Sequence, residues 1–366
     1  MQSYAGFSYT KHLKMGQSTS SNLCTGRRPR TSLAEKKKIL IVNDDGVFAP
    51  GLRCLVKNLC KRLGDYNDVA IFVLAPDRER SASSHSVTTR GSLTAVDVTA
   101  KLKASFASPN DGSHCLIAAY SLTGLPVDCA QLALEGTLFE SDTPFSFDLC
   151  ISGINLGHNA GTNVTYSGTL GAAREAALRG VPSLAVSLDI HSSGSKVADA
   201  ESPFEHAAIL ASDIAHELVR GGLAATPSPP KEQASGAPPS ASLWNINVPK
   251  VEAGKASARH PYPGVWLTRQ SAFRIVAQFQ LERTTANGTE VAPYIGAAVR
   301  DDALGTDTHA LERGWVSVTP ILADVELQYG CSNASEMRLR SMAEVTRKLA
   351  HRVNLALRVL DETTKA

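Results

Sequence analysis

Three groups of polar residues directly follow runs of apolar residues, and their side chains carry oxygen groups that bind metals and phosphate. The first is NDDG at 43–46, the second is the hydroxyl-rich stretch 77–86 that contains Ser81, and the third begins at Asn155 and ends in SGT at 167–169. Carboxylate, hydroxyl and carboxamide oxygens are hard donors, which suit Mg²⁺ or Mn²⁺ better than zinc. A divalent cation beside a phosphate is therefore the chemistry that these residue types favour.

The third group ends where a helix is expected to begin. Backbone N–H groups and the dipole at a helix N-terminus favour an anion such as phosphate. A cation held by Asp44 and Asp45 next to the turn Ser167-Gly168-Thr169 would suit metal-assisted hydrolysis of a phosphate ester. The simpler interpretations stay open, because an Asp-Gly pair also marks an ordinary turn and residues 77–86 also suit an exposed loop.

Other known sites fit the sequence less well. The seven cysteines form no CxxC pair, which argues against both a zinc ribbon and a regular disulfide framework. The glycines at 153, 157 and 161 do not follow the first strand or match GxGxxG, so a dinucleotide-binding oxidoreductase is a weak alternative. Neither a P-loop nor a GxSxG nucleophile elbow is present.

Alternating apolar runs and helical patterns predict the elements that position these groups. Strands are expected at 38–43, 69–74, 147–152, 181–188 and 243–248, β structure between 87 and 122, and helices at 51–63, 127–134, 168–179 and 204–220. The pattern predicts a doubly wound, mostly parallel α/β sheet with a Rossmann-like three-layer core. A β-hairpin is expected around Asn287-Gly288, followed by an amphipathic C-terminal helix over 336–360.

Ligands in open α/β sheets bind beyond the carboxyl ends of the strands. All three polar groups follow predicted strands, so the fold is expected to bring them to one edge of the sheet. Sequence separation is then no obstacle to a single site built from Asp44, Asp45, Ser81 and Asn155.

Composition bounds the class of protein. The 366 residues are 43% hydrophobic and 20% charged, with no apolar run near the roughly 20 residues that a membrane span requires. Residues 1–38 hold eight Lys or Arg and one acid, so the remainder carries 29 basic and 34 acidic side chains. The folded body is therefore mildly acidic, and we expect neither membrane nor nucleic-acid binding.

The chain divides into three parts. Residues 1–37 are basic, rich in Ser and Thr and poor in acids, so they are either a disordered extension or a transit peptide. The protein is expected to be cytoplasmic, or in the second case imported into a plastid or mitochondrion. Residues 38–330 form the expected catalytic domain, with an exposed insertion at 225–242 that holds five prolines, and 331–366 carry the C-terminal helix.

Three segments together resemble one known family. Residues 39–52, 75–88 and 151–187 are similar in sequence, order and spacing to the SurE family of survival-protein nucleotidases and acid phosphatases. Weaker similarity continues at 124–129, 245–249 and 306–320, so that the resemblance spans about residues 38–325.

This resemblance implies the roles of individual residues. It places Asp44, Asp45, Ser81 and Asn155 at the four metal ligands of the family, with one Mg²⁺ or Mn²⁺ per subunit. It also places Asn159 and the SGT turn (Ser167, Gly168 and Thr169) at the groups that contact phosphate. Family members hydrolyse nucleoside 5′- and 3′-monophosphates and form dimers or tetramers by exchanging C-terminal elements. A homodimer or homotetramer is accordingly expected here, with the hairpin and the C-terminal helix contributing to it.

Several points of mechanism stay open at this stage. Asp44 or Asp45 orients the attacking water, or one of them is itself the nucleophile. His85 and His158 are each either a general acid or a surface residue. The alternative to the enzyme is a catalytically inactive nucleotide-binding module on the same fold. Metal-dependent phosphate release separates the two.

Overall fold

The computed structural model describes most of the chain after residue 31. The described residues are 32–64, 66, 68–106, 113–139, 146–190, 202–220, 241–251, 258–285, 288–299, 301, 303–323, 333–353, 355 and 357–358. The basic extension and the Pro-rich insertion fall almost wholly outside them, so both interpretations of the N-terminus, and the compartment they imply, stay predictions. Within the described part, no helix is long and apolar enough to cross a membrane.

A ten-stranded sheet forms the centre of the described structure, in the order β12-β8-β11-β7-β6-β5-β1-β2-β4-β3. Its strands are β1 (Lys37–Val42), β2 (Val69–Pro76), β3 (Ala95–Asp97), β4 (Leu116–Leu122), β5 (Leu149–Leu156), β6 (Ser183–Asp189), β7 (Leu243–Pro249), β8 (Val265–Leu267), β11 (Val316–Ile321) and β12 (Leu357–Arg358). The six strands from β7 to β4 in this order are mutually parallel, and β3 and β11 join them antiparallel. The predicted mostly parallel α/β fold is confirmed.

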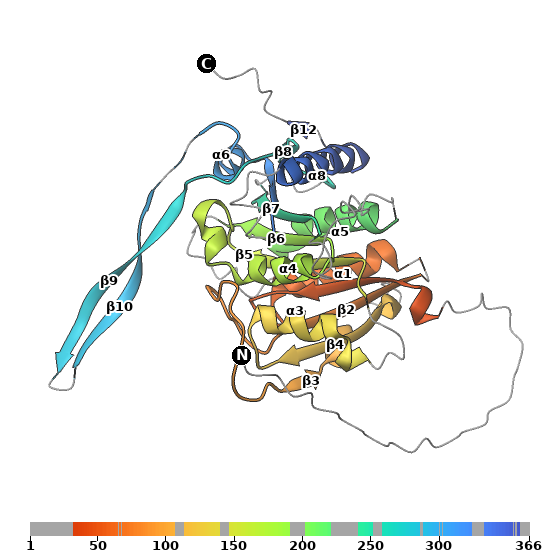
Figure 1. The fold of residues 1–366 in the computed structure, drawn as a ribbon, viewed down its shortest axis with the longest axis horizontal. Coiled ribbons are helices and arrows are strands. Elements are labelled where there is room, and N and C mark those ends of the chain that lie inside the picture. Colours follow the sequence, from red (N-terminus) through yellow and green to blue (C-terminus); the bar gives the residue numbers. More distant parts are fainter. Residues whose placement is uncertain are drawn as a thin grey trace, which may run out of the picture.

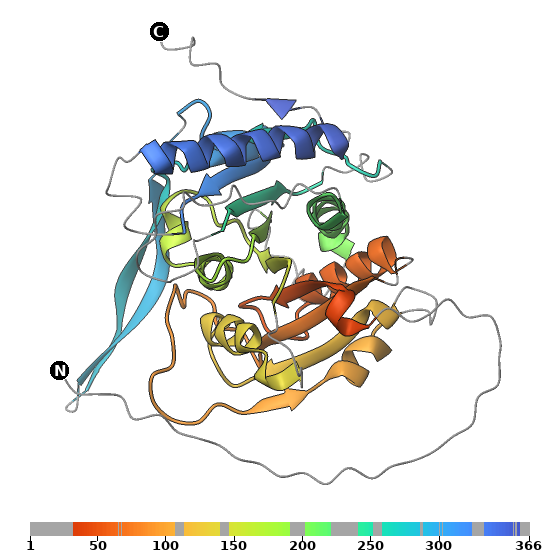
Figure 2. The ribbon, with the colours of Figure 1, turned by 45° about the vertical axis from the view of Figure 1, so that its right-hand side comes forward.

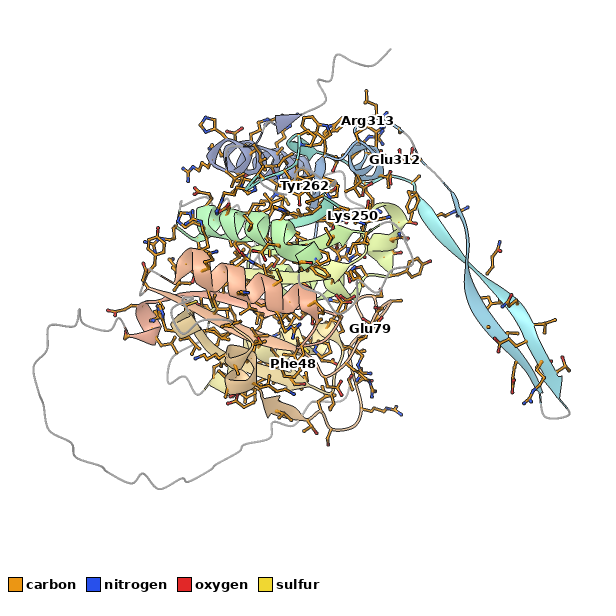
Figure 3. The ribbon with its side chains drawn as sticks, turned by 180° about the vertical axis from the view of Figure 1, so that it is seen from behind. Phe48, Glu79, Lys250, Tyr262, Glu312 and Arg313 are labelled. Carbon is orange, nitrogen blue, oxygen red and sulfur yellow. The ribbon has the colours of Figure 1, made fainter. Side chains whose placement is uncertain are left out.

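Helices cover both faces of the sheet, giving three layers (Figures 1 and 3). They are α1 (Pro50–Leu63), α2 (Thr99–Ala104), α3 (Pro126–Glu135), α4 (Gly168–Leu178), α5 (Glu205–Arg220), α6 (Asp307–Glu312) and α8 (Asn333–Arg352). Along β1, Ile39 and Ile41 pack into the core under α1 and α5, whereas Leu40 and Val42 pack into the core under α3 and α4. A continuous apolar run is the expected pattern for a strand that is buried on both faces.

The predicted hairpin is present as β9 (Arg274–Thr285) and β10 (Gly288–Val299), a separate antiparallel pair. It extends away from the sheet (Figures 1 and 2). Its cross-strand pair Leu281 and Val291 is 73% and 54% exposed, and Phe279 is 67% exposed. The hairpin therefore presents apolar side chains outside the core of this chain.

Two sequence-based boundaries need correction. The strand predicted to end at residue 152 continues to Leu156, because Asn155 and Leu156 pair with β6 after a register shift. The C-terminal helix ends at Arg352 instead of residue 360, and Leu357 lies in β12, paired with Val265. Helical periodicity continues through this sequence, but β8 would be the edge of the sheet without β12, and its backbone offers residues 357 and 358 a strand partner that the helix cannot provide.

The segment 87–122 is only partly β structure. It contains β3 and β4, but also the short helix α2, which begins at Thr99. The backbone N–H of Thr99 donates a 2.8 Å hydrogen bond to the Asp97 carboxylate just before the helix. A local Asp side chain of this kind competes with strand pairing and turns the chain. The prediction missed that signal.

Candidate active site at the carboxyl ends of the strands

The first polar group closes a tight turn after β1. The Asn43 side chain donates to Gly46 O at 2.9 Å and accepts from Gly46 N at 3.2 Å. This turn fixes the intervening Asp44 and Asp45 at the carboxyl end of the strand. Asp44 is only 3% exposed, and Asp45 is half-buried.

Burial dominates the electrostatics of these two acids. Desolvation raises the pKa of Asp44, opposed by hydrogen bonds that include the one from Thr169. Desolvation and then the neighbouring Asp44 charge raise the pKa of Asp45 to about 7. Among the described residues, neither carboxylate forms an ion pair. Two adjacent charged carboxylates, one buried and one half-buried, are costly without a cation, so the pair is suited to hold one.

The second loop passes directly over the first. Arg80 N donates to Asp44 O at 2.7 Å, and the next residue is Ser81. The exposed Ser81 hydroxyl donates to Glu79 Oε1 at 2.8 Å. The structure therefore brings the backbone at Ser81 to the acids, while its hydroxyl bonds to a carboxylate that the sequence analysis did not consider.

The third group reaches the same place from β5. Asn155 Nδ2 donates to Gly157 O at 2.7 Å, which leaves the carboxamide oxygen without a hydrogen bond in the described structure. Leu156 N donates to Asp45 Oδ2 at 3.4 Å. Because Val42 of β1 pairs with Ser152 of β5, the parallel register brings Asn155 near the end of β1.

The N-terminus of α4 completes the cluster. Ser167 is the N-cap and accepts a 3.0 Å hydrogen bond from Leu170 N, as a serine at this position is expected to do. Thr169 Oγ1 donates to Asp44 Oδ1 at 2.6 Å. Gly168 lies so close that a Cβ there would be 2.5 Å from Ser83 Oγ and 3.0 Å from Asp44 Oδ2. Glycine is required here by close approach.

Ser83 is a residue that the sequence analysis did not single out. Its hydroxyl is buried and has no hydrogen-bond partner in the described structure. Both this hydroxyl and the Asp44 carboxylate lie close to Gly168 in the first turn of α4, where an oxygen-rich ligand would supply the missing partner. The signal in the sequence was the density of hydroxyls in residues 81–86, which does not say which of them points inward.

Asn159 forms its hydrogen bonds with residues of β6 and β7. Its Nδ2 donates to Ser187 Oγ at 2.9 Å, its backbone N donates to Asn247 Oδ1 at 2.7 Å, and its carbonyl accepts from Asn245 Nδ2 at 2.7 Å. These contacts fix the loop to β6 and β7. No hydrogen bond joins Asn159 to Asp44 or Asp45 in the described structure.

A second interaction locks the Ser81 loop to α4. His85 Nε2 lies 3.1 Å from Glu175 Oε2, and Glu175 also accepts from Arg179 Nε at 2.9 Å and Gln131 Nε2 at 3.2 Å. The hydrogen bond with His85 is the main cause that lowers the pKa of Glu175. His85 therefore has a structural partner. The sequence analysis did not identify Glu175. The feature that could have indicated it is that Glu175 is the single acid in a helix made mostly of small residues.

The donors present fit a hard divalent cation. The described residues contain no cluster of three or more His, Cys, Asp and Glu side chains placed to hold a metal. What they do bring together is an uncompensated pair of acids, an unpaired carboxamide oxygen and hydroxyls, the donor set of Mg²⁺ or Mn²⁺. The fit rests on this donor chemistry and on the buried negative charge.

Comparison with known proteins adds an independent line of evidence. Residues 39–276 match the family model described as survival protein SurE. A 5′-nucleotidase SurE of Symbiobacterium thermophilum is 35% identical over 289 residues, which cover 78% of this chain and 93% of that protein. One of Christiangramia forsetii is 31% identical, covering 83% and 98% of the two chains. A crystal structure of the SurE protein from Aquifex aeolicus matches with 26% identity and a TM-score of 0.51, covering 84% of this chain and 99% of that one.

Proposed function

The chain belongs to the SurE family, and from that premise we propose that it hydrolyses nucleoside 5′- and 3′-monophosphates to nucleoside and phosphate, with a divalent cation. It is a phosphoric monoester hydrolase, in keeping with its relatives that are named 5′-nucleotidases. The observation that carries the proposal is the hydrogen bond from Thr169 to Asp44, which joins the acids to the N-terminus of α4.

Four side chains would hold the cation, which is Mg²⁺ or Mn²⁺ at one per subunit. They are Asp44, Asp45, Ser81 and Asn155. In this role Ser81 Oγ would exchange its present contact with Glu79 for the cation. When bound, the cation supplies Lewis-acid polarisation of the phosphoryl group.

The remaining chemistry falls to groups of the chain itself. The first turn of α4, with Ser167, Gly168 and Thr169, directs backbone N–H groups and a positive dipole end toward the phosphate. The unpartnered Ser83 hydroxyl donates to a phosphate oxygen. Asn159, which is fixed by Asn247 and Ser187, orients the loop that borders the substrate, and the second hydrogen of its Nδ2 donates to the phosphate.

One of the two acids acts on the reacting atoms. Asp45 is the more exposed of the two, so it either orients the attacking water or attacks phosphorus itself. Asp44 accepts a hydrogen bond from Thr169 through one carboxylate oxygen, so its side chain is less free to move. The stereochemical course at phosphorus distinguishes the two routes, because a single attack by water inverts the configuration, whereas two displacements through an aspartyl-phosphate intermediate retain it.

The test of the proposal is phosphate release from 5′-AMP, 3′-AMP and a chromogenic phosphate ester, with Mg²⁺, Mn²⁺ or EDTA. We expect activity that requires the cation and that falls by at least a hundredfold in Asp45→Asn. Asp97→Asn, on the edge strand β3, is the matched control and should leave activity unchanged. Nucleotide binding without phosphate release under any cation would reject the enzyme in favour of the inactive binding module.

We also propose that the protein is a homodimer or homotetramer assembled through the hairpin. Support comes from the exposed side chains of Phe279, Leu281 and Val291 on an arm that extends from the sheet. Apolar surface of this kind commonly marks an interface. Light scattering should give a multiple of the chain mass, reduced to the monomer in Phe279→Asp/Leu281→Asp. A monomeric wild-type protein would rule the proposal out.

A further inference from the structure

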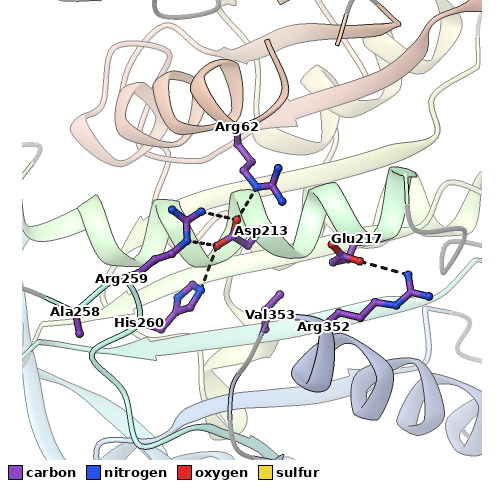
Figure 4. A pocket seen from close by; sticks show the side chains of 8 residues that line it. All are labelled: Arg62, Asp213, Glu217, Ala258, Arg259, His260, Arg352 and Val353. Carbon is purple, nitrogen blue, oxygen red and sulfur yellow. Dashed lines mark hydrogen bonds and ion pairs between the residues drawn. The ribbon is translucent and has the colours of Figure 1, made fainter. Parts of the chain in front are cut away.

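A charged cavity lies on the α1 and α5 face of the molecule, built from residues that the proposed active site does not use (Figure 4). Its volume is about 560 Å³, within the range of pockets that bind small molecules. Arg62 of α1, Asp213 and Glu217 of α5, Arg259 and His260 of the segment before β8, and Arg352 at the end of α8 contribute to its lining.

The described part of the lining gathers positive charge. Three guanidinium groups from three separate parts of the chain lie there beside two carboxylates. Arg62 and Arg259 both bond to Asp213, and Arg352 Nη1 lies 3.3 Å from Glu217 Oε2. Asp213 therefore orients Arg62 and Arg259 with one negative charge for two positive ones. An anion is the ligand that such a lining would attract.

Arg62 and Arg259 also have hydrogen-bond donors to spare. Arg62 bonds to Asp213 only through Nε, at 2.7 Å, so neither of its Nη groups has a partner in the described structure. Arg259 uses Nε and Nη2, at 3.0 and 2.7 Å, which leaves Nη1. A guanidinium has five N–H donors in a fixed plane, a geometry that matches the oxygens of phosphate. Two such groups are held side by side by one carboxylate.

His260 is the third residue that bonds to Asp213. Its Nε2 lies 3.1 Å from Asp213 Oδ2, and its side chain is 10% exposed. Nδ1 is enclosed by the protein and does not face the open cavity. His260 therefore helps to fix the carboxylate that orients Arg62 and Arg259.

We propose that this cavity is a second anion site, in which the spare Nη groups of Arg62 and Arg259 bind a phosphate group, with Arg352 beside it. The phosphate is either inorganic phosphate or the phosphate of a nucleoside monophosphate, and the cavity is large enough for either. The site does not depend on the proposed hydrolase activity, because it shares no residue with the acids or with the N-terminus of α4.

The test is calorimetric titration of the full-length chain, in EDTA, with inorganic phosphate and separately with AMP. We expect saturable binding that weakens with salt and weakens at least tenfold in Arg62→Gln/Arg259→Gln. Arg347→Gln is the matched control, because that arginine lies on α8 with an exposed partner, Glu344, outside the cavity. Tighter binding of AMP than of phosphate identifies the nucleotide as the ligand, and equal binding identifies the phosphate group alone.

Arg62→Lys tests the same site if the double variant does not fold. It keeps the charge but loses the planar fork, so phosphate binding should weaken while the melting temperature changes little. Unchanged affinity in a folded Arg62→Lys or double variant would overturn the proposal and leave the arginines as structural ion pairs. Binding that disappears in Ser167→Ala/Thr169→Val but persists in the arginine variants would also overturn it, because the phosphate then binds at the proposed active site.

Discussion

Thr169 donates a 2.6 Å hydrogen bond to the buried carboxylate of Asp44 across 125 residues of sequence. This contact joins the turn after β1 to the first turn of α4, the helix that follows β5 in the sequence. A buried carboxylate needs hydrogen bonds to remain charged, and Thr169 is one of the groups that lower the pKa of Asp44 against desolvation. The residue assigned to phosphate therefore also supports a proposed cation ligand.

Thr169→Val should test that double role. Valine keeps the shape but removes the hydroxyl, so Asp44 loses a hydrogen bond that for a charged group contributes about 1.5–3 kcal/mol. We expect kcat/KM to fall roughly 10- to 100-fold. Titration with Mn²⁺ should also give weaker cation binding. Thr169→Ser retains the hydroxyl and should keep most of both properties. Full activity and cation binding in Thr169→Val would show that the hydrogen bond does not matter, and equal losses in the two variants would show that the hydroxyl alone does not account for the effect.

Glu175→Gln should loosen the loop that carries Ser81. Glu175 holds His85 of that loop at 3.1 Å, and its negative charge also pairs with Arg179. We expect faster amide hydrogen exchange over residues 81–86 and a loss of about 1 kcal/mol of stability. Glu344→Gln removes an exposed acid that pairs with Arg347 on α8, and should change neither. Unchanged exchange in the loop would mean that other contacts hold it.

The sequence was sufficient to predict the parts of this fold that have strong local signals. The runs in β1 and β2 are apolar without interruption because both faces are buried, and the groups after β1, β2 and β5 converge because those strands are parallel. β12 was missed because Leu357 fits a helical stripe as well as an edge strand. Its state depends on pairing with β8, which is distant in sequence.

Side-chain direction was the least predictable property of the site. Ser81 and Ser83 lie in the same loop and have the same side chain, yet one hydroxyl bonds to Glu79 at the surface and the other is buried beside Gly168. Two residues of this loop, Ala82 and Ser84, have left-handed backbone conformations, with φ of 57° and 55°. Such conformations in non-glycine residues depend on tertiary contacts. Spacing alone therefore could not assign the roles.

Gly171→Ala should test whether the stability of α4 and the position of the loop at residues 81–86 can be changed independently. Alanine favours helix by about 1 kcal/mol over glycine, but a Cβ at this position would lie 2.3 Å from the carbonyl oxygen of Ser84. The loop backbone must move, and overpacking of this kind costs about 1–3 kcal/mol. We expect lower activity together with a lower melting temperature. A variant that is more stable and fully active would show that the loop tolerates the displacement.

Asp213 should make stability depend on pH in the acid range. Hydrogen bonds from His260, Arg259 and Arg62 hold the pKa of this carboxyl below its ordinary value, despite desolvation that raises it. A lowered folded pKa means stabilisation that is complete above the unfolded value of about 3.9 and is lost as pH falls below it.

The measurement is urea unfolding of the wild type and Asp213→Asn from pH 7 to pH 3. At pH 7 the variant should be less stable by about 1.5–3 kcal/mol, because it loses charge-assisted hydrogen bonds to two arginines. The difference should shrink as pH falls below about 4, where Asp213 in the unfolded wild-type chain begins to bind a proton that the folded carboxyl does not bind. Asp97→Asn is the comparison variant for these unfolding measurements. Asp97 is an exposed acid, and its pKa is lowered only by hydrogen bonds that it accepts from Thr99. A wild-type advantage over Asp213→Asn that stays constant down to pH 3 would mean that shape, and not charge, accounts for what Asp213 contributes.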